Sequence, residues 1–213
     1  MGELDLTATS VFLDFDGTVS VADVSDHLLE RLGAPGWRAA EAAIEATGLG
    51  TRAWLLEMWD HLPHDEVMLR AVAAEVALDD GFESLATALR AAGAEVAVVS
   101  DGFGFYVEET CARFGLPALT NHPDFATGRL GLPYEDRCCP CSSCGVCKQS
   151  PIKDAQTAGR TAVLVGDGAS DFKAALVADD VFAKGELARW CEDNEIDHRR
   201  FDCLAEVEQA LVG

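Results

Sequence analysis

The sequence predicts an α/β protein built on a doubly wound parallel sheet, with a helical subdomain inserted into it. The first observation behind this prediction is a set of three short apolar runs, each followed by an acidic or hydroxyl residue. Runs of this length and composition are typical of strands that are covered on both faces. The second observation is that amphipathic helical patterns lie between these runs, and a parallel sheet requires such an alternation of strand and helix.

The strands are expected at residues 10–14, 95–100 and 161–167, where valine, leucine, phenylalanine and alanine are bounded by glycine, serine or aspartate. Amphipathic helices are expected at residues 82–92, 105–114, 150–158 and 171–178. The first two of these helical patterns stop at Gly93 and Gly115, because glycine readily adopts the left-handed conformation that ends many helices.

Residues 21–80 do not follow this alternation, because their pattern is helical throughout. We therefore predict a helical cap at residues 21–80, inserted into a core domain formed by residues 1–20 and 81–213. Trp37, Trp54 and Trp59 lie on apolar faces of the predicted cap helices, where packing is the expected role of their rings. Glycine and proline punctuate residues 116–147, which predicts an irregular excursion with a hairpin around residues 128–132.

The chain of 213 residues has a formal net charge of −21 at pH 7, with 37 acidic residues against 16 lysines and arginines. Such a surface would repel nucleic acids and anionic membranes, so neither is an expected partner. The acidity is compatible with a high-salt habitat and equally with a biased genome composition. The sequence contains no recognisable signal peptide and no apolar run long enough to span a membrane, which predicts a cytoplasmic protein.

Polar groups that could react or bind follow each predicted strand. The first strand leads into Asp14-Phe15-Asp16-Gly17-Thr18, the second into Ser100-Asp101-Gly102, and the third into Asp167-Gly168-Ala169-Ser170-Asp171. The carboxyl ends of parallel strands meet at one edge of the sheet, where ligands bind. A lone Asp-Gly pair is usually only a turn, but polar segments at three strand ends favour one shared site.

These groups suit phosphoryl transfer. One carboxylate of the pair Asp14 and Asp16 can attack phosphorus while the other carries a proton. The hydroxyl of Ser100 and the backbone N–H groups after it can bind phosphate oxygens. A hard cation must offset the mutual repulsion of four carboxylates, and Mg²⁺ is suited to that role. These four are Asp14, Asp16, Asp167 and Asp171.

The order and spacing of these segments resemble those of the haloacid dehalogenase (HAD) superfamily, and in particular its phosphoserine-phosphatase-like branch, which has a helical cap between the first two motifs. The resemblance extends over nearly the whole chain. It implies a HAD-like Rossmannoid fold. It also implies an Mg²⁺-dependent phosphatase that hydrolyses a small phosphorylated metabolite through an aspartyl-phosphate intermediate.

The resemblance further implies a role for each matching residue. Asp14 would be the nucleophile and Asp16 the general acid and base. The other matches would bind phosphate (Ser100, Asp101 and Gly102), hold Mg²⁺ (Asp14, Asp167 and the backbone carbonyl of Asp16) and orient metal-bound water (Asp171).

The family also places a lysine beside the phosphate, where it neutralises charge as the phosphoryl group moves. Lys148 and Lys153 both precede the third predicted strand. We predict Lys148, because it stands directly before a helix, as the family's lysine does. Lys153 is the alternative, and it would lie within that helix and face solvent.

Lys148 closes residues 137–148, a segment that is rich in cysteine. This segment has few large apolar residues that could hold its shape by burial. We therefore expect a clamp around Lys148, made by a structural Zn²⁺ and thiolates that recur at every third position. These are Cys138, Cys141, Cys144 and Cys147. Disulfides are the main alternative, disfavoured by a reducing compartment. A metal- or redox-sensing module is the competing function of another class.

Two relatives within the branch resemble this chain in having a cysteine-rich segment before the lysine. They are the phosphatase of the methionine-salvage enol phosphate, 2-hydroxy-3-keto-5-methylthiopentenyl-1-phosphate, and the phosphatases of phosphoethanolamine or phosphocholine. The first resembles the chain better, because it shares the pattern around Asn121-His122. The segment Ser100-Asp101-Gly102 departs from it, since Ser-Gly-Gly is expected there.

Phosphoserine is a further alternative substrate. Asp23 stands where phosphoserine phosphatases place an acidic group that meets the substrate amine, although capping of a helix is an equally simple role for it. Transfer of the phosphoryl group to an alcohol instead of water would use the same motifs, so a phosphotransferase stays an alternative to a hydrolase.

Overall fold

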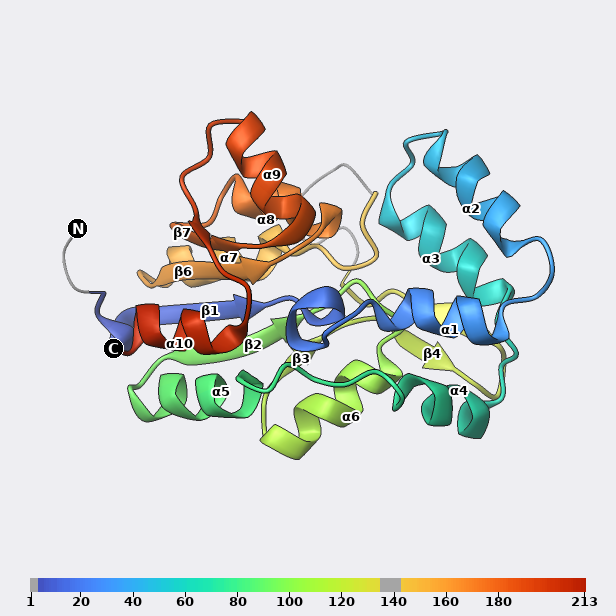
Figure 1. The fold of residues 1–213 in the computed structure, drawn as a ribbon, viewed down its shortest axis with the longest axis horizontal. Helices are drawn as coiled ribbons and strands as arrows, with labels where there is room; N and C mark the ends of the chain where they lie inside the picture. The colour runs from blue at the N-terminus through green and yellow to red at the C-terminus, as the bar shows by residue number, and fades with distance from the viewer. Residues whose placement is uncertain (1–3, 135–142) are drawn as a thin grey trace.

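The structure, a computed structural model, describes residues 4–134 and 143–213 (Figure 1). Its centre is a six-stranded sheet in the order β3-β2-β1-β6-β7-β8, whose strands pair in parallel. The strands are β1 (Thr9–Leu13), β2 (Glu95–Val99), β3 (Ala118–Leu119), β6 (Thr161–Gly166), β7 (Asp180–Ala183) and β8 (Arg199–Arg200). The order reverses at β1, so the predicted doubly wound parallel sheet is confirmed.

β1 lies between β2 and β6 and is buried on both faces. Val11 is in register with Val96 of β2 and with Val163 of β6. Val11 and Leu13 belong to the larger of two apolar clusters, whereas Phe12 belongs to the other, as expected when successive side chains point to opposite faces. The continuous apolar run of β1 therefore reflects a strand covered on both sides.

Two layers of helices cover the sheet (Figure 1). On one face lie α5 (Phe82–Ala91), α6 (Phe105–Phe114) and α10 (Leu204–Leu211), with α10 packed against α5. On the other face lie α7 (Gln149–Thr157), α8 (Phe172–Ala175) and α9 (Gly185–Asp193). Short 3₁₀ turns, at Leu6–Ala8 and Ala169–Asp171, precede β1 and α8.

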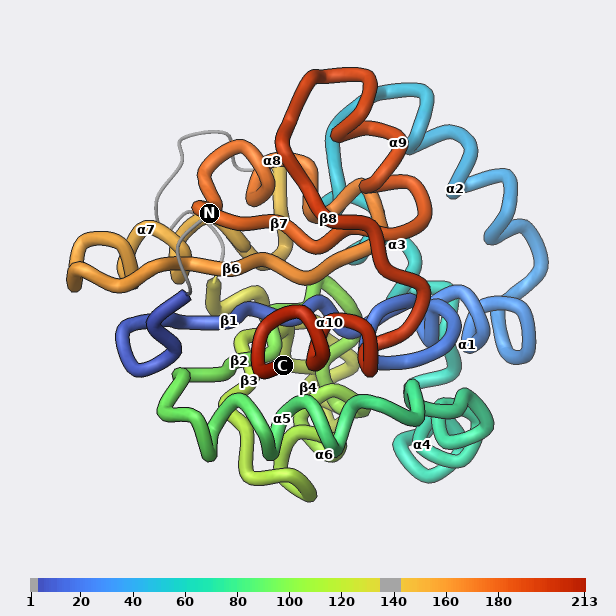
Figure 2. The backbone as a smooth tube through the Cα atoms, turned by 60° about the vertical axis from the view of Figure 1, so that its left-hand side comes forward, coloured from blue at the N-terminus to red at the C-terminus, as the bar shows by residue number. Residues whose placement is uncertain are grey.

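Four further helices, which we call the cap helices, stand beyond the carboxyl end of β1. They are α1 (Val24–Leu32), α2 (Trp37–Glu45), α3 (Thr51–Asp60) and α4 (Glu66–Ala73). Figure 2 shows the cap helices gathered on one side of the molecule, with α7 on the opposite side. The chain enters and leaves this group side by side, because Val21 N–H donates to the carbonyl of Ala77 and Asp79 N–H donates to that of Val19.

Some elements differ from the sequence prediction. The three predicted strands appear as β1, β2 and β6, but the shorter outer strands were not predicted: β3 and β8 at the two edges, and β7 next to β8. The helix expected at residues 171–178 is shorter, because a 3₁₀ turn occupies Ala169–Asp171 and α8 ends at Ala175. The predicted hairpin is present as the antiparallel pair β4 (His122–Asp124) and β5 (Arg129–Gly131). Within the described ranges, none of the helices has the length and apolarity to cross a membrane.

Candidate active site

The site begins where β1 ends. Asp14 extends the ladder by one hydrogen bond, from its N–H to the carbonyl of Val165 at 2.9 Å, and its side chain is buried at the strand's carboxyl end. The chain then turns at Gly17, whose φ of +76° is favourable only for glycine. A Cβ at Gly17 would collide with the carboxylate of Asp167, so the absence of a side chain lets the first and third motifs approach each other.

Lys148 lies between two carboxylates at the centre of the site. Its Nζ is 2.7 Å from Oδ1 of Asp14 and 2.7 Å from Oδ1 of Asp171, and it donates to the Ser170 hydroxyl at 2.8 Å. Only 4% of Lys148 is exposed, so these contacts replace water around the ammonium group. Burial by itself lowers the pKa of Lys148, but Asp14 and Asp171 outweigh burial and raise it, which keeps the side chain charged.

Asp14, Asp167 and Asp171 each place one carboxylate oxygen within 4.8 Å of the others. Burial raises the pKa of Asp14 well above its ordinary value, and the charge of Asp171 raises it further. Burial, together with Asp171, raises the pKa of Asp167 to about 6, although a hydrogen bond from Thr18 opposes the shift. Negative charge here exceeds what Lys148 offsets, so the donor set fits a hard divalent cation such as Mg²⁺.

Asp171 already has partners for both of its oxygens. Oδ1 faces Lys148, and Oδ2 accepts the backbone N–H groups of Asp167 and Gly168 at 3.2 and 3.4 Å. These contacts leave Asp171 less able than Asp14 or Asp167 to bind a cation directly. Thr18 similarly holds Asp167, since its hydroxyl donates to Oδ1 at 2.8 Å.

Asp16 is oriented by a residue that the sequence analysis missed. The hydroxyl of Tyr106 lies 3.1 and 2.9 Å from the two carboxylate oxygens of Asp16, and the N–H of Val24 donates to Oδ1 at 2.9 Å. Burial raises the pKa of Asp16 well above its ordinary value, and the nearby charge of Asp23 adds to that shift. The only sequence signal for Tyr106 is its place in the first turn of the helix that follows the second motif.

The second motif provides donors beside Asp16. The Ser100 hydroxyl is 3.4 Å from Oδ2 of Asp16 and accepts the N–H of Gly102 at 3.0 Å. A Cβ at Gly102 would collide with the Tyr106 hydroxyl and the Asp16 carboxylate, so glycine is needed there. The carboxylate of Asp101 has a different neighbourhood: Oδ1 accepts the N–H of Val146 at 2.6 Å, and Oδ2 accepts the hydroxyl of Thr51.

The family model of the haloacid dehalogenase-like hydrolases matches residues 11–176. The chain belongs to the haloacid dehalogenase-like hydrolase family. The matched region contains all three strand-end motifs and Lys148, which confirms the resemblance noted from the sequence.

Relatives over nearly the full length are named 2-hydroxy-3-keto-5-methylthiopentenyl-1-phosphate phosphatase. One from Brevibacillus brevis is 26% identical over 209 residues, covering 94% of each chain. One from an Exiguobacterium species is 27% identical over 212 residues, covering 97% of this chain and 98% of the relative.

Solved structures share the HAD fold. A phosphoserine phosphatase with an analogue of its phospho-aspartyl intermediate has a TM-score of 0.66 at 19% identity, covering 99% of this chain and 100% of that one. A probable phosphoserine phosphatase from Vibrio cholerae has a TM-score of 0.71 at 21% identity, covering 98% of this chain and 65% of that one.

The HAD motifs form the base of a cavity of about 450 Å³. Asp14, Asp16 and Asp167 line its base, and the cap helices form the opposite wall. The wall residues that could meet a substrate are Asp23, Asp26, Glu41, Glu45 and Trp54. Trp54 was expected only to pack in the core; Trp59 does so, with 1% exposure, whereas Trp54 also faces this cavity.

The cap wall of the cavity is strongly acidic. Burial, together with the charges of Asp23, Glu41, Glu30 and Glu45, raises the pKa of Asp26 to about 7. The indole N–H of Trp54 donates to Glu41 at 3.0 Å and so fixes that carboxylate beside an aromatic ring. Asp23 caps α1 by accepting the N–H of Asp26 at 2.9 Å, and it lines the cavity as well.

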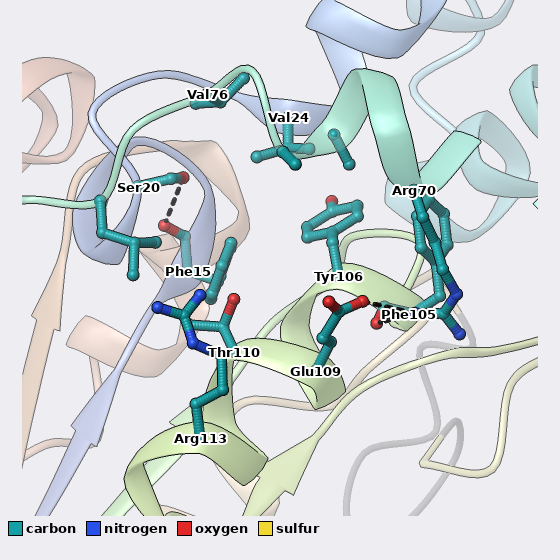
Figure 3. A pocket seen from close by; sticks show the side chains of 13 residues that line it. Phe15, Ser20, Val24, Arg70, Val76, Phe105, Tyr106, Glu109, Thr110 and Arg113 are labelled. Atoms are coloured by element: carbon teal, nitrogen blue, oxygen red, sulfur yellow. Dashed lines mark hydrogen bonds and ion pairs between the residues drawn. The ribbon is translucent and has the colours of Figure 1, made fainter. Parts of the chain in front are cut away.

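A second, smaller cavity of about 130 Å³ lies on the far side of Tyr106, between α4 and α6 (Figure 3). Phe15, Val24 and Phe105 form apolar parts of its wall, and Arg70 pairs with Glu109 at 2.7 Å along one side. None of the motif aspartates is among its lining residues, so the predicted chemistry belongs to the larger cavity.

The structure favours Lys148 over Lys153, because Lys148 contacts Asp14 and Lys153 lies within α7. Of the predicted zinc ligands, Cys138 and Cys141 lie outside the described residues. Among residues 4–134 and 143–213, the one group suited to a metal is the three aspartates, and it includes no cysteine. The structural Zn²⁺ therefore stays a prediction without support.

Part of the reasoning behind the zinc clamp is wrong for residues 143–148. Val146 and Cys147 are 1% and 3% exposed, and Val146 packs in the same apolar cluster as Ile152 of α7. The N–H of Cys147 donates to the carbonyl of Tyr134 at 3.1 Å. Burial and backbone hydrogen bonds thus hold the residues that lead into Lys148.

Proposed function

We propose that this HAD hydrolase is an Mg²⁺-dependent phosphomonoesterase that works through an aspartyl-phosphate at Asp14. The observation that carries the proposal is the position of Asp14, buried at the carboxyl end of β1 and paired with Lys148, at the base of a cavity. The names of the full-length relatives support the same class of reaction.

In the first step an oxygen of Asp14 attacks the phosphorus atom of the ester. Oδ1 is held by the N–H of Phe15 at 2.7 Å and by Lys148, which leaves Oδ2 to attack. The bond from Asp14 to phosphorus forms as the bond to the ester oxygen breaks, and the departing alkoxide takes a proton from Asp16. The raised pKa of Asp16 favours the protonated form that this step needs.

In the second step water attacks the phosphorus atom of the aspartyl-phosphate. Asp16, now ionised, accepts a proton from this water, the bond from phosphorus to Asp14 breaks, and inorganic phosphate is released. Tyr106 keeps the carboxylate of Asp16 aimed at the same place in both steps. The Ser100 hydroxyl, the N–H of Gly102 and Lys148 would bind the phosphoryl oxygens throughout.

Asp14, Asp167 and the backbone carbonyl of Asp16 would hold Mg²⁺, with Asp171 in a supporting position. When bound, the metal supplies positive charge that offsets the repulsion between the phosphoryl group and the carboxylates. We expect thorough chelation to abolish hydrolysis of p-nitrophenyl phosphate and added Mg²⁺ to restore it.

Binding of Mg²⁺ should also raise the thermal unfolding midpoint of the protein, because a cation relieves repulsion among the buried aspartates. Asp167→Asn should reduce this shift, whereas Asp60→Asn, a change at the exposed end of α3, should not. Hydrolysis that survives chelation, or an unfolding midpoint insensitive to Mg²⁺, would remove the metal from the proposal.

The substrate we propose first is the methionine-salvage enol phosphate, because the full-length relatives carry that name. The cap wall favours a second candidate, a phosphate ester with an amine or quaternary ammonium group, such as phosphoserine, phosphoethanolamine or phosphocholine. A cation would offset the repulsion between Asp23, Asp26 and Glu41, and the ring of Trp54 suits an ammonium group. A cytoplasmic location, where such metabolites occur, belongs to the same proposal.

Asp23→Asn separates these two substrates. Asparagine is as good a helix cap as aspartate, so the stability of α1 should be kept. If an amine meets this wall, KM for phosphoethanolamine or phosphoserine should rise about 10-fold, because a charged hydrogen bond is lost, while KM for p-nitrophenyl phosphate stays unchanged. Asp65→Asn, which alters the matching cap of α4, is the control.

The same selectivity should depend on pH. The pKa of Asp26 is raised to about 7, so this carboxyl is charged at pH 8 and mostly protonated at pH 6. The ratio of kcat/KM for the amine ester to that for p-nitrophenyl phosphate should therefore fall as the pH is lowered through 7. If neither Asp23→Asn nor pH changes this ratio, the role of Asp23 would be capping of α1 alone. The methionine-salvage enol phosphate, which has no amine, would then be favoured.

A further inference from the structure

The carboxylate of Asp101 joins three segments that are far apart in the sequence. It belongs to the second motif, its Oδ2 accepts the hydroxyl of Thr51 in the first turn of α3, and its Oδ1 accepts the N–H of Val146 at 2.6 Å. α3 is a cap helix. Val146 belongs to residues 143–148, which lead into Lys148 and which we call the lysine segment. A single side chain thus bridges the cap helices, the phosphate-binding segment and the lysine segment.

Other contacts also join the start of α3, the second motif and the lysine segment. The N–H of Arg52 donates to the carbonyl of Ser143 at 3.0 Å, so the start of α3 is bound directly to the lysine segment. A Cβ at Gly50 would collide with Ser143, and a Cβ at Gly145 would collide with Leu55 of α3 and with Asp101. Two glycines therefore allow residues 143–146 to lie between α3 and the second motif.

The placement of Lys148 depends on this packing. Lys148 follows Val146 by two residues, and all three residues from Val146 to Lys148 are nearly fully buried. A shift of Val146 would move the ammonium group away from Asp14, which it contacts at 2.7 Å. A misplacement of about 1 Å at such a group can cost about 100-fold in rate.

Direct binding of phosphate is a poor alternative role for the Asp101 carboxylate. It would bring two anions together, and both of its oxygens already accept hydrogen bonds. The N–H groups of the second motif stay suited to phosphate, since Asn121 fixes this segment by donating from Nδ2 to the carbonyl of Gly102 at 2.8 Å.

We propose that Asp101 is a positioning residue that couples docking of the cap helix α3 to placement of Lys148 at Asp14. The proposal rests on the phosphatase function argued above. When α3 is docked, Thr51 and Val146 share one carboxylate and Lys148 is held at the nucleophile. When α3 moves away, Asp101 loses the Thr51 hydroxyl, and the lysine segment loses its contacts with the start of α3.

The test is a double-mutant cycle between Thr51→Val and Asp101→Ala. Each single change should lower kcat about 10- to 100-fold, because a hydrogen bond to a charged group is lost. In each variant, inhibition by inorganic phosphate should weaken by the same factor as kcat. The double variant should be no worse than Asp101→Ala alone, since both changes break one chain of contacts. Thr51→Ser, which keeps the hydroxyl, should behave as wild type, and so should Thr47→Val, outside this chain of contacts.

A second measurement does not depend on activity. Hydrogen–deuterium exchange of a peptide covering residues 143–148 should be faster in Thr51→Val than in wild type, and unchanged in Thr47→Val. Asp101→Asn can still accept from the N–H of Val146 and bond to Thr51. This variant should therefore lose less activity than Asp101→Ala.

Unchanged exchange in Thr51→Val, additive losses in the cycle, or an Asp101→Asn variant as impaired as Asp101→Ala would each overturn the coupling. A wild-type protein that hydrolyses no phosphomonoester in the presence of Mg²⁺ would overturn the proposed function instead. In that case the exchange experiment would still decide whether Thr51 and the lysine segment are coupled.

Discussion

Asp14→Asn is expected to abolish phosphatase activity, with a loss of about 10⁴-fold or more, while the fold is kept. The amide has no negative charge and is a poor nucleophile toward phosphorus, so the aspartyl-phosphate cannot form. The change also removes a buried carboxylate whose pKa is raised by burial and by Asp171. The thermal unfolding midpoint should accordingly stay the same or rise. Steady-state kinetics measures the loss of activity, and circular dichroism of the same preparations measures the unfolding midpoint.

The covalent step can be observed directly. Brief reaction with a ³²P-labelled substrate, followed by an acid quench, should leave label on the wild-type protein and none on Asp14→Asn. Asp60→Asn is a matched control, because Asp60 is an exposed aspartate at the end of α3. Wild-type turnover by Asp14→Asn would refute the nucleophile, whereas turnover without acid-stable label would point to direct attack by water.

Lys148→Met is expected to lower kcat by about 10²–10³-fold, the usual effect of removing one preorganised group that stabilises transition-state charge. Lys148 holds Asp14 at 2.7 Å and Asp171 at 2.7 Å, so its loss leaves two buried carboxylates without their shared cation. Breaking a buried ion pair by removing one partner typically costs about 3–5 kcal/mol of unfolding free energy. Activity and urea unfolding should therefore fall together, with added Mg²⁺ recovering part of the stability.

Lys153→Met is the natural control for this experiment, because the two lysines differ in position by only five residues. It lies within α7 and should leave kcat unchanged. Lys148→Arg keeps the charge and tests the site if Lys148→Met fails to fold. Loss of activity in Lys153→Met, with normal activity in Lys148→Met, would reverse the assignment of the lysine.

The centre of the candidate site could be predicted because each part of it is local in sequence. A buried strand such as β1 is recognisable from its own apolar residues, and the acidic residues that follow it must emerge at the carboxyl end of the sheet. Asp14 and Asp167 were predicted to lie together on this basis, and Lys148 was added from the family resemblance; the side chains do lie together. The short strands β3, β7 and β8 were missed because runs of two to four residues carry too little pattern.

The partners of the predicted residues could not be read from the sequence. Tyr106 reaches Asp16 only because α6 starts beside the end of β1, and Trp54 meets Glu41 only because α3 packs against α2. The backbone around Asp101 was predicted to bind phosphate, and the sequence did not indicate that the Asp101 carboxylate meets Thr51 and the N–H of Val146. Each of these contacts joins segments whose relative position depends on how whole helices pack.

By itself, then, the sequence determined the parallel sheet, the inserted helices, the HAD family and the residues at the strand ends. The sheet, the inserted helices and the strand-end residues follow from the periodicity and spacing within short stretches of chain, and the family follows from the resemblance of its motifs. None of these depends on how the helices pack. The tertiary structure alone decided the acidic wall facing the nucleophile, the hydrogen bonds that aim Asp16, and the contact between the cap helices and the lysine segment. The physical reason is that a hydrogen bond or an ion pair forms only within a few ångströms, and that proximity is set by packing between elements far apart in the chain.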